Sequence, residues 1–220
     1  QWDTVMNYDA FMEPLTWFLT GMEKHSDDYQ PGMLGNARSF VDAMRYHMVS
    51  FLAPSLQVAM NELSNHDHSR FLTRTNHHVG RVSHLGSDAA SRDIHPEVMR
   101  EAVVMQMTWP GAPTLYYGDE AGVCGFTDPD NRRTYPWGRE DQQMIAFHKA
   151  AIAMHKKYPV LTGGSLKFLY EDYNILSYGR FSRRQQIVVV FNNNDSERTI
   201  SLPVWMAGVS DHQVLQRVFY

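Results

Sequence analysis

Residues 63–72, LSNHDHSRFL, concentrate the side chains of this chain that are best able to do chemistry. Between apolar residues they hold an amide, two imidazoles, a carboxylate and a guanidinium, on Asn65, His66, Asp67, His68 and Arg70. Such a set fits a metal site, a catalytic centre or a polar loop without further role. Which of the three applies depends on the rest of the chain.

A second polar cluster comes later, with Asp119 and Glu120 followed by the run DPDNRR at residues 128–133. Both clusters directly follow short extended runs, and sites in parallel α/β folds are built at the C-terminal ends of strands. Asp119 and Glu120 are not expected to form a catalytic pair, because neighbours in an extended run point to opposite faces. We expect them to anchor the loop instead.

The histidines are compatible with a metal site, since a His-x-His pair binds metal in amidohydrolase-type barrels. In that class the pair follows the first strand, and further histidines and an aspartate end other strands. The other histidines of this region lie in a polar stretch without such strands. We therefore assign no metal ligand and expect His68 and its neighbours to be solvated: His77, His78, His84 and His95.

The composition is that of an ordinary globular protein. Of 220 residues, 43% are hydrophobic and 20% charged, and the net charge of −4 gives no reason to expect a nucleic-acid partner. No apolar run approaches the ~18 residues of a membrane helix, so no membrane association is expected. The sequence begins at Gln1, and we expect no signal peptide. We expect a cytoplasmic protein, with secretion left open.

Extended and helical patterns alternate up to about residue 158. Apolar residues at spacings of three and four predict helices at 37–53, 95–109 and 139–158, the first with Asn36 as N-cap. Short runs rich in β-formers predict strands at 2–8, 57–65 and 112–118. This alternation of strands and helices is typical of a parallel α/β arrangement.

From residue 159 onward the pattern changes to short β-rich runs separated by turn signals, which predicts an antiparallel β module. We expect its strands at 165–172, 174–182, 185–193, 198–204 and 214–220. The last run reaches the end of the sequence, which leaves open that this module is truncated.

Three segments resemble the α-amylase family of glycoside hydrolases, family 13, and in particular its cyclomaltodextrinase, neopullulanase and maltogenic amylase branch. SNHDHSRF is similar to the motif that follows strand seven of that family's barrel. WDTVMNY and PGAPTLYYGDEAGVCGFTDPDNRRTYPW are similar to its strand six and strand-eight region. One such motif would be weak evidence, but three in the family's order and spacing are specific.

The resemblance implies an α/β fold in two parts. Residues 1–158 would be the C-terminal part of a (β/α)8 TIM barrel, about strands six to eight, and residues 159–220 an antiparallel β-sandwich domain. A complete barrel takes about 250 residues, so this chain cannot hold one. The half-barrel would expose a sheet edge, through which homo-oligomers could form.

The resemblance also implies roles for single residues. Family members cleave α-glucosidic bonds with retention, using a nucleophilic aspartate and a glutamate acid/base. Asp67 matches their third carboxylate, which binds hydroxyls of the sugar beside the scissile bond and favours its distorted, oxocarbenium-like state. His66 matches a histidine that donates a hydrogen bond to the same sugar. The expected substrates are α-glucans, maltooligosaccharides or cyclodextrins.

The remaining candidate residues would support these two. Asn65 and Arg70 would fix the loop and neighbouring carboxylates, and Asp128 and Arg132 match a polar pair that touches sugar hydroxyls at the edge of the cleft. Each assignment has a plainer alternative: Asp67 could merely cap its loop, and Asp128 and Arg132 could merely pair with each other.

Two motifs of the family are missing from this sequence: the Gly-x-Arg-x-Asp pattern that holds the nucleophile, and the glutamate on the next strand. We therefore expect the chain to be catalytically inactive on its own. The alternative, from another class, is a non-catalytic carbohydrate-binding or assembly protein that keeps half a barrel. No cofactor is expected; calcium is possible in the complete enzyme, but no ligand for it can be assigned here.

Overall fold

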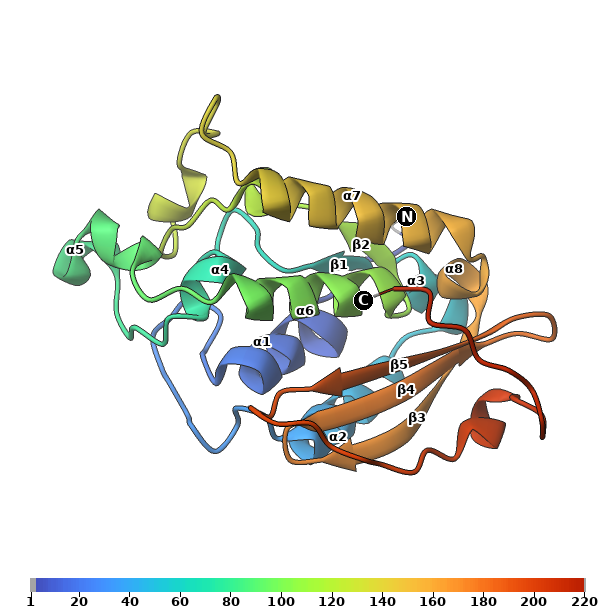
Figure 1. Cartoon of the computed structure of the whole chain (residues 1–220). Helices are drawn as coiled ribbons and strands as arrows, with labels where there is room; N and C mark the ends of the chain where they lie inside the picture. The colour runs from blue at the N-terminus through green and yellow to red at the C-terminus, as the bar shows by residue number, and fades with distance from the viewer. Residues whose placement is uncertain (1–2, 220) are drawn as a thin grey trace.

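The computed structural model describes residues 3–219 and shows a mixed α/β fold with two sheets (Figure 1). Strands β1 (Met60–Glu62) and β2 (Ala112–Thr114) pair in parallel. The second sheet is antiparallel, in the order β3 (Ser165–Asp172), β4 (Ile175–Phe181) and β5 (Gln186–Asn192). In Figure 1, α7 lies at the top and the antiparallel sheet at the bottom, with α6 and the parallel pair between them.

Helices of different lengths connect the strands. The longer ones are α1 (Glu13–Thr20), α2 (Ala37–Met48), α6 (Pro96–Thr108) and α7 (Gln142–Lys157). The shorter ones are α3 (Ala53–Gln57), α4 (Phe71–Arg74), α5 (Val82–Leu85) and α8 (Val160–Gly163). Short π or 3-10 turns occupy Tyr8–Met12, Ser87–Ser91, Asp119–Ala121, Asp130–Arg132 and Val204–Ala207.

Local signals explain where the long helices begin. Asn36 caps α2 as predicted, since its side-chain oxygen accepts from a backbone N–H of the first turn at 3.0 Å. Asp141 caps α7 in the same way at 2.9 Å. Pro96 stands in the first turn of α6, where its missing N–H costs nothing. The three predicted helices are confirmed, although α2 ends at Met48 instead of continuing to residue 53.

The predicted strands of the first part are shorter than expected. The strand predicted at 57–65 is reduced to β1, and the one at 112–118 to β2. In the range 2–8, where residue 2 lies outside the described residues, only Met6 forms a parallel bridge, to Met60. The sequence prediction misses α1 altogether. Its Pro14 stands in the first turn, a position that tolerates proline.

In the second part, three of the predicted strands are confirmed as β3, β4 and β5. The strand predicted at 198–204 is wrong: Pro203 lacks the N–H that a ladder needs, and a 3-10 turn begins directly after it. The strand predicted at 214–220 is also wrong over its described residues, 214–219, which have no regular secondary structure. The described residues after 158 therefore form one sheet, not the two facing sheets of a sandwich.

One hydrophobic core runs through the helices and the antiparallel sheet. Within it the fully buried Trp109 meets the rings of Phe40, Phe168 and Tyr178 at centroid distances of 5.6, 5.8 and 5.2 Å. The Tyr178 hydroxyl also lies 2.6 Å from the Thr108 hydroxyl at the end of α6. Packing is thus continuous across residue 158, and the domain boundary expected there stays a prediction.

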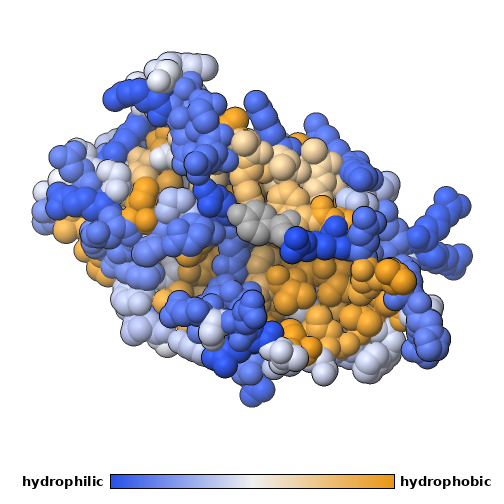
Figure 2. All heavy atoms as spheres, in the orientation of Figure 1, coloured by the Kyte–Doolittle hydropathy of each residue, from blue (hydrophilic) through white to orange (hydrophobic). Residues whose placement is uncertain are grey.

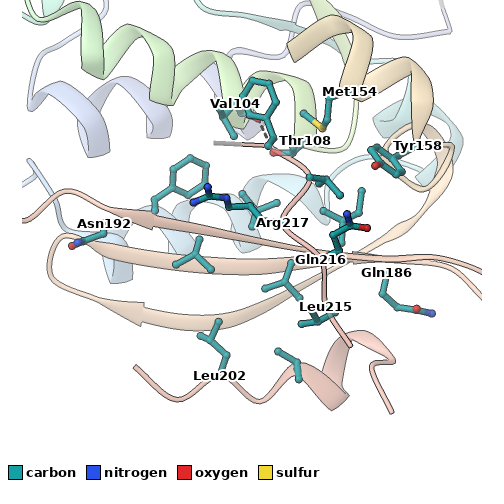
Figure 3. A pocket seen from close by; sticks show the side chains of 18 of the residues that line it. Val104, Thr108, Met154, Tyr158, Gln186, Asn192, Leu202, Leu215, Gln216 and Arg217 are labelled. Carbon is teal, nitrogen blue, oxygen red and sulfur yellow. Dashed lines mark hydrogen bonds between the residues drawn. The ribbon is translucent and has the colours of Figure 1, made fainter. Parts of the chain in front are cut away.

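A groove of about 900 Å³ lies between β5, α6, α7 and the C-terminal segment (Figure 3). Val104 and Met154 contribute to its walls from the helices, and Leu215 from the C-terminal segment. Figure 2 shows apolar side chains gathered on this face of the molecule. Val214, in the same segment, is 89% exposed. None of the candidate site residues lines this groove.

Glu101 on α6 lies partly buried in the wall of this groove, and burial raises the pKa of its carboxyl to about 8. With the Asn193 amide oriented so that its nitrogen faces Glu101, that nitrogen donates to the carboxylate, to Oε2 at 2.8 Å. In the unfolded chain the group ionises near its ordinary pKa of about 4.3, so ionisation favours unfolding. We expect the free energy of unfolding to fall as the pH rises from about 5 towards 8, by at most about 1 kcal/mol per pH unit.

Glu101→Gln should remove this fall, because glutamine does not ionise. The measurement is urea unfolding of both proteins at two pH values inside the window. Comparing the proteins at each pH cancels the titration of all other groups. Glu97→Gln is the control, since the Glu97 side chain on the same helix is 66% exposed, and the fall should persist in it. An identical pH dependence of wild type and Glu101→Gln would refute the assignment.

Candidate active site

The loop after β1 and the segment after β2 meet in one place. The buried side chain of Asn131 donates through Nδ2 to the carbonyl oxygens of Asn65 and His68, at 3.1 and 2.7 Å. The Arg70 backbone N–H donates to the Gly125 carbonyl oxygen at 2.8 Å. The two polar clusters of the sequence are therefore parts of one site.

Asn65 shapes the loop from within. Its side-chain oxygen accepts hydrogen bonds from the backbone N–H groups of Asp67 at 2.9 Å and His68 at 3.1 Å. Its side-chain nitrogen donates to the Tyr8 hydroxyl at 3.0 Å and to Glu62 Oε2 at 3.2 Å. The residue is buried. Its side chain acts on the backbone of the loop; the family resemblance implies such a loop-fixing role for it.

Asp67 and His66 are the exposed members of the loop. Each side chain is 51% exposed, and His66 Nε2 lies 3.4 Å from Asp67 Oδ1. The backbone beneath them is fixed, because the Asp67 carbonyl oxygen accepts hydrogen bonds from the Thr127 hydroxyl and, at 3.4 Å, from the Asp128 N–H. A carboxylate that accepts and an imidazole that can donate, side by side, suit adjacent hydroxyls of a sugar.

Arg70 is fully buried and links the two clusters. Its Nη1 donates to Asp119 Oδ1 at 3.0 Å and to the Tyr117 carbonyl oxygen at 2.6 Å. Its Nε donates to the Asn131 carbonyl oxygen at 2.9 Å, and the guanidinium lies 4.0 Å from the ring centre of Tyr116. Arg70 therefore contacts protein groups on several sides, and its buried side chain holds the two polar clusters together.

Asp119 and Glu120 hold the structure rather than face a ligand. Burial raises the pKa of the Asp119 carboxyl above its usual range, and the Arg70 guanidinium opposes this by favouring the ionised form. Glu120 accepts a hydrogen bond from the Gly118 N–H at 2.9 Å. These contacts are those of loop anchors, as the sequence suggested.

Asp128 and Arg132 form an ion pair at the rim of the loop. Arg132 Nε lies 2.6 Å from Asp128 Oδ1, and about half of each side chain is exposed. The same Nε lies 3.2 Å from the His66 carbonyl oxygen. The pair is thus placed beside His66, where both groups can reach solvent.

The expectation that His68 is solvated is wrong. Only 4% of its surface is exposed, and its ring packs edge-on against Tyr8 and His25, with centroids 5.0 and 4.8 Å away. Burial lowers the pKa of His68 to about 3, so the imidazole is neutral at physiological pH. The burial of His68 could not be read from the polar residues around it, because its packing partners lie far away in the sequence.

Sequence reasoning also misses three side chains that hold the site together: Glu62, Thr127 and Asn131. Glu62 had a signal, since it stands within a run predicted to be a strand, where burying a carboxylate costs free energy unless it is hydrogen-bonded. Thr127 and Asn131 lie within the second cluster, but their residue types do not show which carbonyl oxygens they bind. His25 continues the network, with Nδ1 at 2.8 Å from Thr127 Oγ1.

Other ligand chemistry finds little support among residues 3–219. In this range no three His, Cys, Asp or Glu side chains lie close enough to share a metal ion. Burial raises the pKa of the Cys124 thiol to about 11, so it is protonated at neutral pH. No helix in the described part of the chain combines the length and apolar character needed to cross a bilayer.

Comparison with known proteins places the chain in a family. Residues 36–159 match the family described as alpha amylase, catalytic domain. The chain is 31% identical over 212 residues to Neopullulanase 2 of Thermoactinomyces vulgaris, covering 94% of this chain and 31% of that enzyme. It is 38% identical over 127 residues to an amylopullulanase of Thermoanaerobacter thermohydrosulfuricus, covering 58% of this chain and 8% of that enzyme.

Solved structures agree with this placement. The native debranching enzyme of Nostoc punctiforme superposes with a TM-score of 0.79 at 25% identity, covering 98% of this chain and 42% of that one. The chain therefore spans less than half the length of each of these relatives. The resemblance read from the three sequence segments is confirmed. Because the match covers more than half of the chain and includes both polar clusters, this chain belongs to the α-amylase catalytic-domain family.

Proposed function

We propose that this chain is the C-terminal part of the catalytic domain of a retaining α-glucan hydrolase, in which Asp67 and His66 bind the sugar beside the scissile bond. One observation carries the proposal. The two side chains are half exposed and 3.4 Å apart, on a loop whose backbone is held by buried partners. This loop follows a parallel strand, the position at which barrel enzymes bind their substrates.

The order of the parallel segments supports a partial barrel. Met6 bridges to Met60 of β1, and β1 pairs with β2, so three segments lie side by side in parallel. In the proposed enzyme they are strands six, seven and eight. The nucleophile and the acid/base would come from strands four and five, which this sequence does not include. The chain on its own would then not cleave sugars.

Exposed apolar side chains near the first of these segments fit the same proposal. Val5, Met6 and Val58 are 56%, 37% and 48% exposed. In a complete barrel the preceding strand would cover this edge. In the isolated chain the edge would favour association between copies.

We propose starch-derived oligosaccharides or cyclodextrins as the substrates. Relatives named neopullulanase and cyclomaltodextrinase support α-glucans as the class. The rim pair of Asp128 and Arg132, beside His66, would contact hydroxyls of a neighbouring sugar. Retention would leave the newly formed reducing end in the α configuration.

The first test is to sequence the coding DNA upstream of the Gln1 codon. An in-frame Gly-x-Arg-x-Asp motif followed by a glutamate on the next strand is expected. The complete polypeptide should then hydrolyse β-cyclodextrin or pullulan and release the α-anomer first, as seen by NMR. A start codon close upstream without these motifs would contradict the proposal and leave a non-catalytic carbohydrate-binding or assembly protein.

A further inference from the structure

Glu62 is a buried carboxylate that the proposed mechanism does not use. It ends β1, just before the loop, and only 6% of its surface is exposed. Burying a carboxylate costs free energy unless hydrogen bonds replace the lost water. Its Oε2 accepts a hydrogen bond from the Asn65 side-chain nitrogen at 3.2 Å, and burial raises the pKa of the carboxyl above its usual range.

The contact between Glu62 and Asn65 matters because the asparagine amide has an oxygen that accepts hydrogen bonds and a nitrogen that donates them. Asn65 turns its oxygen toward the N–H groups of Asp67 and His68, and its nitrogen toward Glu62 and Tyr8. The opposite orientation would bring the Asn65 oxygen against the Glu62 carboxylate. An ionised carboxylate can accept hydrogen bonds but cannot donate them, so two acceptors would face each other. The Tyr8 hydroxyl both donates and accepts, so it tolerates either orientation. On this side of the amide, Glu62 is the group that selects one.

We propose that Glu62 is a positioning residue for Asp67. Its carboxylate fixes the orientation of the Asn65 side chain, and the Asn65 oxygen then holds the backbone N–H groups of Asp67 and His68. The link to sugar binding rests on the proposed function of Asp67. The positioning itself is a property of this chain and can be measured without substrate.

The test exchanges donor and acceptor between the two side chains in the 220-residue chain. The readout is hydrogen exchange of the Asp67 and His68 backbone amides, followed by NMR. Asn65→Asp alone places two carboxylates face to face and should speed exchange at both amides by about tenfold. Glu62→Gln alone should stay within about threefold of wild type, since its amide oxygen still accepts.

The double variant, Asn65→Asp with Glu62→Gln, should return to within about threefold of wild type, because the introduced glutamine can donate to the introduced aspartate. Amides in the core of α6, at Val103 and Met107, report global stability and should not follow this pattern. If Asn65→Asp fails to fold, recovery of the folded chain in the double variant is the expected result.

A double variant that exchanges as fast as Asn65→Asp, or remains unfolded with it, would overturn the proposal. Unchanged exchange at Asp67 and His68 in a folded Asn65→Asp chain would overturn it as well. Because no sugar is involved, this outcome is separate from the fate of the proposed function, which turnover by the complete enzyme decides.

Discussion

In the complete polypeptide, Asp67→Asn is expected to lower kcat by about a hundredfold or more. Asparagine keeps the size of the side chain but removes its charge and one acceptor. The hydroxyls of the distorted sugar then lose a charge-assisted hydrogen bond, which strengthens as positive charge develops at the anomeric centre. The undistorted substrate depends less on this contact, so KM should change much less than kcat.

Steady-state hydrolysis of β-cyclodextrin measures this effect, with thermal unfolding as the check on the fold. The fold should persist, because the hydrogen bonds that hold the loop use the backbone of Asp67 and not its carboxylate. Asp42→Asn is the matched control: Asp42 is also an exposed carboxylate, 67% of its side chain, but it lies on α2. It should keep wild-type turnover. Near-normal turnover of Asp67→Asn would show that this carboxylate takes no part.

Arg70→Met is expected to lower the free energy of unfolding by about 3–5 kcal/mol. Methionine keeps an unbranched apolar stem but leaves the buried Asp119 carboxylate without its cation. The carbonyl oxygens of Tyr117 and Asn131 each lose a charged donor as well. A buried acceptor without a partner lowers stability, because it has lost its hydrogen bonds to water and forms none within the protein.

Urea unfolding measures this loss, and Arg132→Met is the control. Arg132 also pairs with an aspartate, at 2.6 Å, but both side chains are about half exposed, so its replacement should cost less than about 1 kcal/mol. Adding Asp119→Leu to Arg70→Met should recover part of the stability by removing the unpaired charge. Equal losses for the two arginines would mean that burial does not set the strength of these pairs.

Features that depend on neighbours in the sequence could be predicted. The start of α2 follows from Asn36 and that of α6 from Pro96, since capping and first-turn prolines act within a few residues. The strands β3, β4 and β5 follow one another with short turns, so each run has its partner close by in the chain. The loop of Asp67 stood out because its residue types are unusual between apolar neighbours.

Features that depend on distant contacts could not be predicted in this way. The run at 214–219 has the composition of a strand, but composition supplies no ladder partner, and the segment stays irregular. His68 is buried by rings from residues more than forty positions earlier, Tyr8 and His25. The roles of Thr127 and Asn131 also depend on where the second segment docks, which no local pattern encodes.

The docking of that second segment also sets an order in time. Thr127 binds the Asp67 carbonyl from 60 residues further along the chain, and Asn131 binds that of Asn65 from 66 residues further along. At a synthesis rate of about 5–20 residues per second, the loop leaves the ribosome roughly 3–13 s before these partners. During that interval the loop lacks its hydrogen bonds to Thr127 and Asn131 and keeps those made by Asn65. A nascent chain that stops before residue 127 would carry the whole SNHDHSRF segment and yet lack the half of the site that Thr127 and Asn131 supply.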